Sequence, residues 1–173
     1  MQRFFLSSAL CAFAAAVALA TPAAAETVTV QLRGFEEVPV NVSPATGSLR
    51  LFINDRAGTI DYELAYDNLV GNVTQSHIHV GQMSVNGGIT LWLCQTSTNP
   101  APASVAALTP TCPSGHSGTV TGTLSSANVV AVAAQLVAAG DLDDVVRAIR
   151  AGVAYGNVHS SVEPGGEIRA QLH

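Results

Sequence analysis

The strongest constraint on the fold is an alternation of apolar and polar residues with a period of two. It is clearest in "TVTVQL", "SLRLFI" and "TIDYELAY", where Val28, Leu49 and Ile60 each share one face with the apolar residues two and four positions on. Successive side chains of a β-strand point to opposite faces, so these runs indicate strands with one buried face. Antiparallel sheets show this pattern, and the sequence therefore predicts a mainly β domain.

Further segments extend the prediction to a complete domain. Strands are also expected over residues 75–80, 89–93, 118–124, 153–159 and 167–172, and "NDRAG" and Pro164-Gly165-Gly166 have turn composition. "SSANVVAVAAQLVAAG" is Ala-rich after a Ser, and "DLDDVVRAIRAG" joins an Asp141 cap to an apolar stripe. We expect a short helical insertion on one side of the β domain.

The first 25 residues resemble a secretory signal peptide. Arg3 precedes an apolar run from Phe4 to Ala20, and small residues precede Glu26. The alternative, a membrane anchor, is disfavoured because the apolar run is short. We expect cleavage after Ala25, one domain over residues 26–173, and a secreted or periplasmic protein.

The charge pattern narrows the class of partner. The chain contains no Lys and has a formal net charge of −5. This balance argues against nucleic acid and against an anionic membrane surface. An extracellular protein or a metal ion is the expected partner, with no membrane association after cleavage.

The two cysteines outside the leader, Cys94 and Cys112, are expected to form a disulfide. The reasons are an even number of thiols and an exported chain. The alternative, two free thiols that bind a metal, is weaker in an oxidising compartment. The segment between them is rich in Pro, Ser, Thr and Ala, and little regular structure is expected there.

A His-x-His pair in "QSHIHVG" is the main candidate site. His77 and His79 share one face of the predicted strand, a spacing that can bind one copper or zinc ion. The alternatives are a structural polar pair or two exposed side chains. Ile78 and Val80 are expected to face the core, which leaves the histidines on an outer, polar face.

Other polar residues could join this site. His159 is the candidate third ligand, and His116 in "CPSGHSG" is a weaker fourth. Glu167 and Arg169 alternate outward in the last strand, so we expect Glu167 to orient a ring and Arg169 to lie near. A shared ion requires the three rings within about 4–5 Å. With no complete catalytic set in the sequence, a binding or structural role is favoured over an enzymatic one.

Three longer motifs carry a family resemblance. "RGFEEVPV…ATG", "SHIHVGQMSVNGGI" and "AIRAGVAYGNVHSSVEPGGEIRAQL" resemble the CHRD domain, which is named after chordin and also occurs in bacterial secreted proteins. The resemblance runs from about Val28 to Leu172. It implies an immunoglobulin-like antiparallel β-sandwich, with limited similarity to copper/zinc superoxide dismutases. The molecular function of the family is largely unassigned.

The superoxide dismutase similarity bears on the histidines. Those enzymes bind copper through His-x-His and a later His, so the resemblance implies that His77, His79 and His159 are copper ligands. Arg169 has the place of an arginine that follows the last ligand. The sequence has no dense run of His and Asp for the zinc site, so a copper-binding or vestigial site fits better than dismutase activity.

Overall fold

The computed structural model describes residues 25–173, and the predicted signal peptide lies outside them except for Ala25. The described chain forms an eight-stranded antiparallel sheet, which confirms the mainly β prediction. The strands are β1 (Glu26–Arg33), β2 (Thr46–Asn54), β3 (Thr59–Asp67), β4 (Val73–Val80), β5 (Gly88–Cys94), β6 (Gly118–Leu124), β7 (Ala154–Ser160) and β8 (Ile168–Leu172).

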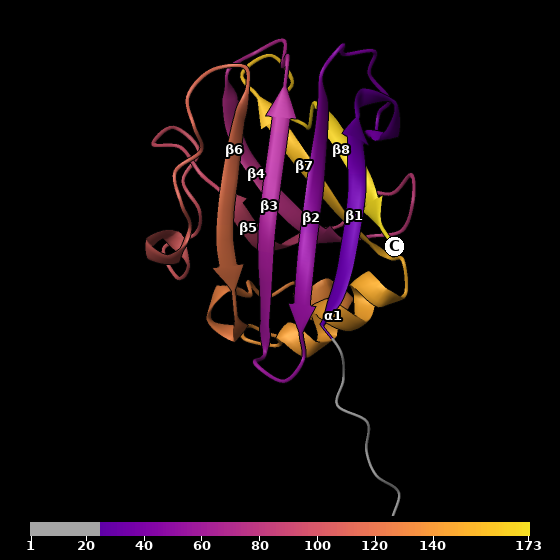
Figure 1. The fold of residues 1–173 in the computed structure, drawn as a ribbon, viewed down its shortest axis with the longest axis vertical. Coiled ribbons are helices and arrows are strands. Elements are labelled where there is room, and N and C mark those ends of the chain that lie inside the picture. The colour runs from indigo at the N-terminus through magenta and orange to yellow at the C-terminus, as the bar shows by residue number, and fades with distance from the viewer. Residues whose placement is uncertain (1–24) are drawn as a thin grey trace, which may run out of the picture.

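The sheet folds into two layers. The strand order is β5-β4-β7-β8-β1-β2-β3-β6, and β1 and β8 are paired at one position only, Arg33 with Arg169. The order therefore divides at this junction. Figure 1 shows β6, β3, β2 and β1 as a front layer, with β5, β4, β7 and β8 crossing behind it. The result is a β-sandwich with a single bridge between its layers.

The front layer follows the alternation of the sequence. On β2, Leu49 and Leu51 are buried while Arg50 between them is exposed. The buried side chains meet those of the back layer, including Ile78 and Val158, in one core cluster. Apolar burial between two such faces is the main stabilising contribution to a sandwich.

The back layer departs from the expected pattern because it is buried on both faces. Every residue of β7 and β8 is buried. Loops cover the outer face: Gln171 Nε2 donates to the Gly81 carbonyl at 2.8 Å, and Asn41 Nδ2 donates to the Glu167 carbonyl at 3.1 Å. The predicted outer, polar face is therefore wrong, and His77 is fully buried.

One of the two predicted helical segments forms a helix. It is α1 (Leu142–Arg150), which lies across one end of the sandwich in Figure 1. Asp141 caps it by accepting a hydrogen bond from the Asp144 N–H at 3.0 Å, and the predicted apolar stripe is buried. This short helical element confirms the expected insertion.

The Ala-rich segment before α1 is not the expected helix. It contains two 3-10 turns, Ser126–Asn128 and Ala133–Gln135. Between them the Val130 N–H donates to the Thr90 carbonyl of β5 at 2.9 Å. Its β-branched valines suit this extended path, and the pairing with β5 outweighs the helix propensity of the alanines.

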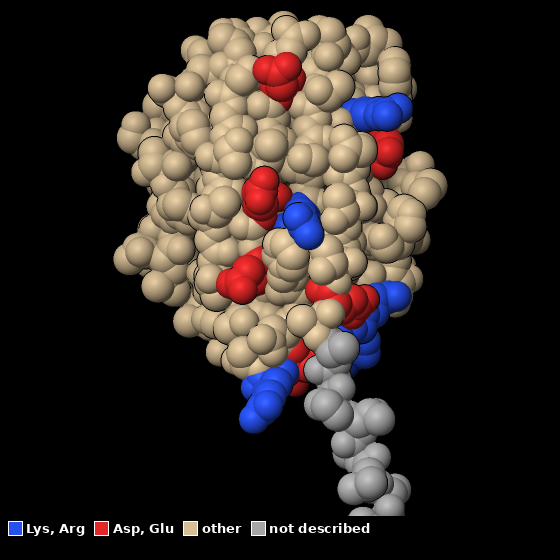
Figure 2. All heavy atoms as spheres, in the orientation of Figure 1, with Lys and Arg blue, Asp and Glu red and all other residues tan. Residues whose placement is uncertain are grey.

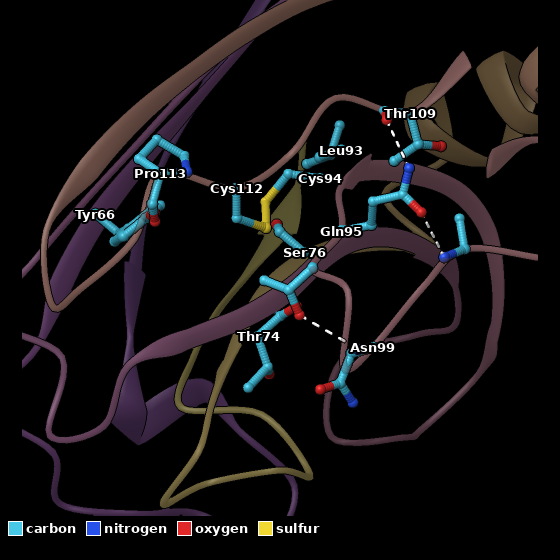
Figure 3. Close-up of a disulfide and its surroundings, with 12 residues drawn as sticks. Tyr66, Thr74, Ser76, Leu93, Cys94, Gln95, Asn99, Thr109, Cys112 and Pro113 are labelled. Carbon is cyan, nitrogen blue, oxygen red and sulfur yellow. Dashed lines mark hydrogen bonds between the residues drawn. A yellow bond between two sulfur atoms is a disulfide. The ribbon is translucent and has the colours of Figure 1, made fainter. Parts of the chain in front are cut away.

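The predicted disulfide between Cys94 and Cys112 is present, with an S–S distance of 2.06 Å. It ties the end of β5 to the loop before β6 (Figure 3). The loop is more ordered than its composition suggests, because Gln95 Nε2 donates to the carbonyls of Ala106 and Thr109, both at 2.7 Å. Figure 3 shows this side chain beneath the loop. One side-chain amide thus helps to organise a segment that also contains the 3-10 turn Ala106–Leu108.

Candidate metal centre

Two neighbouring strands position the three histidines. In the β4–β7 pairing, His77 lies opposite Asn157, and Gln75 lies opposite His159. His77 and His159 are therefore diagonal neighbours on one face, within reach of each other. The His77 ring centroid lies 5.4 Å from that of His79 and 4.9 Å from that of His159.

The ring nitrogens converge. One nitrogen from each of His77, His79 and His159 lies within 4.8 Å of the others. Ligands at about 2.0–2.1 Å from a shared ion would stand about 3.3–3.6 Å apart. Side-chain adjustments of about 1–1.5 Å would bring the three nitrogens to that spacing.

Backbone carbonyls fix the tautomers of two rings. His79 Nδ1 lies 3.0 Å from the Gly87 carbonyl, and His159 Nδ1 lies 3.0 Å from the Pro164 carbonyl. A carbonyl only accepts hydrogen bonds, so each Nδ1 carries the proton and each Nε2 is unprotonated. The Nε2 of His79 lies 3.1 Å from the side-chain amide of Asn157. The contact of Nδ1 with a carbonyl is typical of metal-binding histidines, whose outer nitrogen donates to a carbonyl or carboxylate.

His77 is the least satisfied of the three. Both of its ring nitrogens are buried and have no hydrogen-bond partner within residues 25–173, and the same holds for His159 Nε2. Leaving a buried polar group without a partner costs about 1–3 kcal/mol. The cluster thus places several uncompensated nitrogen atoms in one small volume.

All three imidazoles favour the neutral form. Burial, with smaller effects of His159 and His79, holds the pKa of His77 well below its usual value. Burial lowers the pKa of His79 to about 4 and also lowers the pKa of His159. A neutral imidazole is the form that binds metals, so few protons compete for these nitrogens near neutral pH.

Aromatic rings enclose the cluster. The Trp92 ring centroid lies 4.2 Å from that of His77, and Tyr155 stacks on His79 at 4.5 Å with an interplanar angle of 8°. On the other side of Tyr155, the Arg169 guanidinium lies 3.4 Å from the ring centroid. These walls keep the three histidines away from solvent.

Two further predicted site residues, Arg169 and Glu167, are bonded to groups outside the three rings. Arg169 is separated from His79 by Tyr155 and donates to Asn86 Oδ1 and the Val85 carbonyl. The Glu167 carboxylate accepts from Ser43 Oγ and from the Val70 N–H, both at 2.6 Å. The ring hydrogen bonds described above join His79 to the Gly87 carbonyl and His159 to the Pro164 carbonyl instead.

His116 stands apart from the cluster. It is exposed, and its Nδ1 lies 2.6 Å from the Leu69 carbonyl. It is not among the three converging histidines.

The sequence reasoning did not identify Glu37, Trp92 or Tyr155 as neighbours of the site. Glu37 comes from the loop after β1, is 5% exposed, and its carboxyl group packs against Gly166 in the turn before β8. The motif "RGFEEVPV" marked this segment only as part of the family resemblance. Its place beside β7 depends on how the loop folds over the back layer.

One of the comparisons with known proteins identifies a family. The model of the CHRD domain matches residues 28–172. No curated protein and no solved structure matches this chain. The family match supports a binding or structural module.

Proposed function

This chain belongs to the CHRD domain family, and we propose that it is a metal-binding module in which His77, His79 and His159 hold one copper or zinc ion. The observation that carries the proposal is the state of His77, whose two buried ring nitrogens have no partner within the described residues. A cation at the centre of the cluster would compensate the lone pairs of all three rings at once.

Copper is the favoured ion. Sites built from nitrogen ligands bind copper(II) more tightly than zinc under the usual order of divalent affinities. A closed structural zinc site has four protein ligands, whereas within residues 25–173 the cluster has three members. The superoxide dismutase similarity that the sequence resemblance implies would favour the same ion. We further propose that the bound copper is redox-active.

A structural role is the competing function, and one observation favours it. The Nδ1 hydrogen bonds of His79 and His159 hold the carbonyls of Gly87, in the loop before β5, and of Pro164, in the turn between β7 and β8. Those bonds alone would fix the loops in a protein that never binds a metal. They give no role to the two buried ring nitrogens of His77, which have no partner within residues 25–173, and this is why we prefer the metal site.

We also propose that the domain acts in the periplasm or outside the cell. The signal-like leader and the disulfide support this location. Within residues 25–173, none of the helices has the length and apolar character of a membrane span.

Metal analysis of protein purified without a His tag tests the proposal. We expect about one copper or zinc ion per chain, lost when His77 and His159 are both changed to Ala. His116→Ala is the matched control, because His116 is exposed and outside the cluster, and it should keep the ion. A wild-type protein that stays metal-free after incubation with Cu²⁺ and with Zn²⁺ would leave the structural role as the better description.

A further inference from the structure

Asn157 lies among the three histidines of the candidate metal centre. It is paired with His77 in the register of β4 and β7, and His159 follows it two positions later on β7. Its Oδ1 lies 3.1 Å from Nε2 of His79. Residues two positions apart on a strand, and residues directly opposite on the next strand, share one face of a sheet. Asn157 is therefore a neighbour of each of the three rings.

The back layer holds Asn157 in place. The residue is 3% exposed, and its backbone carbonyl accepts a hydrogen bond from Ser76 Oγ of β4 at 2.6 Å. A buried amide needs a partner for its oxygen as well as for its NH₂ group. Within residues 25–173, the hydrogen-bonding contact of its Oδ1 is the one with His79 Nε2.

This contact brings two lone pairs together. His79 Nδ1 donates to the Gly87 carbonyl, so Nε2 of the neutral ring carries no proton. The amide oxygen of Asn157 also only accepts hydrogen bonds. Two such atoms at 3.1 Å repel each other, unless the amide turns its NH₂ group toward the ring or a cation binds both atoms. The first arrangement would block the lone pair that a metal ion needs, and the second would make both atoms ligands.

The other two rings favour the cation. Both ring nitrogens of His77 and Nε2 of His159 are buried without a partner within the described residues. Turning the NH₂ group of Asn157 toward His79 would leave all three atoms as they are. A cation bound by one nitrogen of each ring and by the amide oxygen would compensate a lone pair on every member of the cluster.

The spacing of the two atoms also suits shared coordination. At about 2.0–2.1 Å from an ion, neighbouring ligands stand about 2.8–3.0 Å apart in a square-planar site and about 3.3–3.6 Å apart in a tetrahedral one. The 3.1 Å between Asn157 Oδ1 and His79 Nε2 lies between these ranges. This pair therefore already has the spacing of two ligands.

We propose that Oδ1 of Asn157 is the fourth ligand of the metal centre, which makes it a copper(II) site of three nitrogens and one oxygen. This inference rests on the proposed function. Asparagine binds metals through its side-chain carbonyl oxygen. A mixed set of nitrogen and oxygen donors suits copper(II), and the amide completes the set without adding a charge.

Competition titration of Cu²⁺ between the protein and a chelator, at about pH 7, tests the inference. Asn157→Leu keeps the size of the side chain but removes the oxygen, so the affinity should fall about ten-fold or more. Asn157→Asp keeps an oxygen and lacks the NH₂ group, and it should bind Cu²⁺ at least as tightly as the wild type. Gln75→Leu, the matched control, removes an amide two positions before His77 on β4 and should bind as the wild type.

Electron paramagnetic resonance of the Cu²⁺ forms reports the ligands directly. We expect Asn157→Leu to change the copper hyperfine splitting, because one ligand is lost. Gln75→Leu should leave the splitting unchanged. A role of Asn157 in packing alone would leave it unchanged in both variants.

The opposite results have distinct meanings. Equal or tighter Cu²⁺ binding by Asn157→Leu would mean that the amide competes with the ion, and would overturn the inference while leaving the three-histidine site intact. Binding by Asn157→Asp as weak as that of Asn157→Leu would overturn it too, as would a wild type that binds Zn²⁺ but not Cu²⁺. A wild type that binds neither ion would overturn the proposed function as well. If Asn157→Leu does not fold, Asn157→Ala replaces it with the same expected loss.

Discussion

The polar positions of the alternating sequence pattern are exposed in one layer of the sandwich and buried in the other. In the front layer the polar positions of the alternation, such as Arg50 and Glu63, are exposed. Figure 2 shows this face as a mostly uncharged surface with a few acidic and basic side chains, some of them adjacent. In the back layer the corresponding polar positions, such as His77 and Arg169, are buried under loops. A strand position that reads as outward is therefore a surface position only where nothing covers the sheet.

The two layers also differ in what their polar side chains contribute to stability and to the candidate site. Exposed charges on an antiparallel sheet contribute little to folding, whereas buried polar groups need partners to be tolerated. All three converging histidines and the two buried carboxyl groups, Glu37 and Glu167, lie in or against the back layer. The front layer has one buried, apolar face. The back layer has a buried, apolar face and, on its other side, buried polar side chains.

The largest expected effect comes from removing the same residue type in each layer. Arg169→Ala should lower the free energy of unfolding by about 3 kcal/mol or more, because Asn86 Oδ1 and the Val85 carbonyl lose their donor. Arg50→Ala on the front layer should cost no more than about 1 kcal/mol, from its contact with the Phe52 ring at 4.4 Å. Urea unfolding of both variants measures the contrast, and equal losses would contradict it.

The disulfide is the next test, because it ties a covering loop to the back layer. Changing Cys94 and Cys112 to Ser should lower the free energy of unfolding by about 3 kcal/mol, given their separation of 18 residues. The denaturant midpoint of the double variant against wild type gives the value. A midpoint unchanged in the double variant would mean that hydrogen bonds such as those of Gln95 hold the loop without the disulfide.

The back layer should also dominate the dependence of stability on pH. The pKa of His79 is lowered to about 4 in the folded state, so between pH 6.5 and 4 the unfolded state binds more protons and stability is lost as pH falls. The pKa of Glu37 is raised to about 7, so this group acts in the opposite direction between about pH 4.5 and 7.

Glu37→Gln removes the opposing contribution. Metal-free variant protein should therefore lose about 2 kcal/mol more than metal-free wild type between pH 6.5 and pH 5. Denaturant unfolding at a series of pH values gives both curves. Parallel curves would show that Glu37 does not titrate in this range.

The smallest effect is expected on the front layer. Glu63 lies opposite Arg50 in the β2–β3 register and is exposed, so Glu63→Gln should change the free energy of unfolding by no more than about 0.5 kcal/mol. The same urea assay measures it. A loss of about 2 kcal/mol would mean that this exposed carboxylate contributes as much to the free energy of unfolding as the buried polar groups do.

The alternation in the sequence was enough to predict β1, β2 and β3. The apolar side chains of each strand are buried on one face, whichever segment packs against that face. Asp141 and the stripe of α1 were equally local signals. The Cys94–Cys112 pairing followed from compartment and parity.

What the sequence could not predict depends on contacts between distant segments. The alternation in β8 cannot reveal that loops such as 81–88 lie over Arg169 and Gln171. The Ala-rich segment from Ser126 was misjudged for the same reason, since its pairing with Thr90 is remote in sequence. The position of Glu37 beside Asn157 required the path of the loop after β1.

Trp92, whose ring lies 4.2 Å from that of His77, is the only tryptophan of the chain. Its fluorescence is therefore an internal optical probe of the histidine cluster, with no other indole to obscure it. Paramagnetic Cu²⁺ at the cluster should quench this emission strongly, while diamagnetic Zn²⁺ should leave most of it. A single cuvette titration can thus report both occupancy and the identity of the ion.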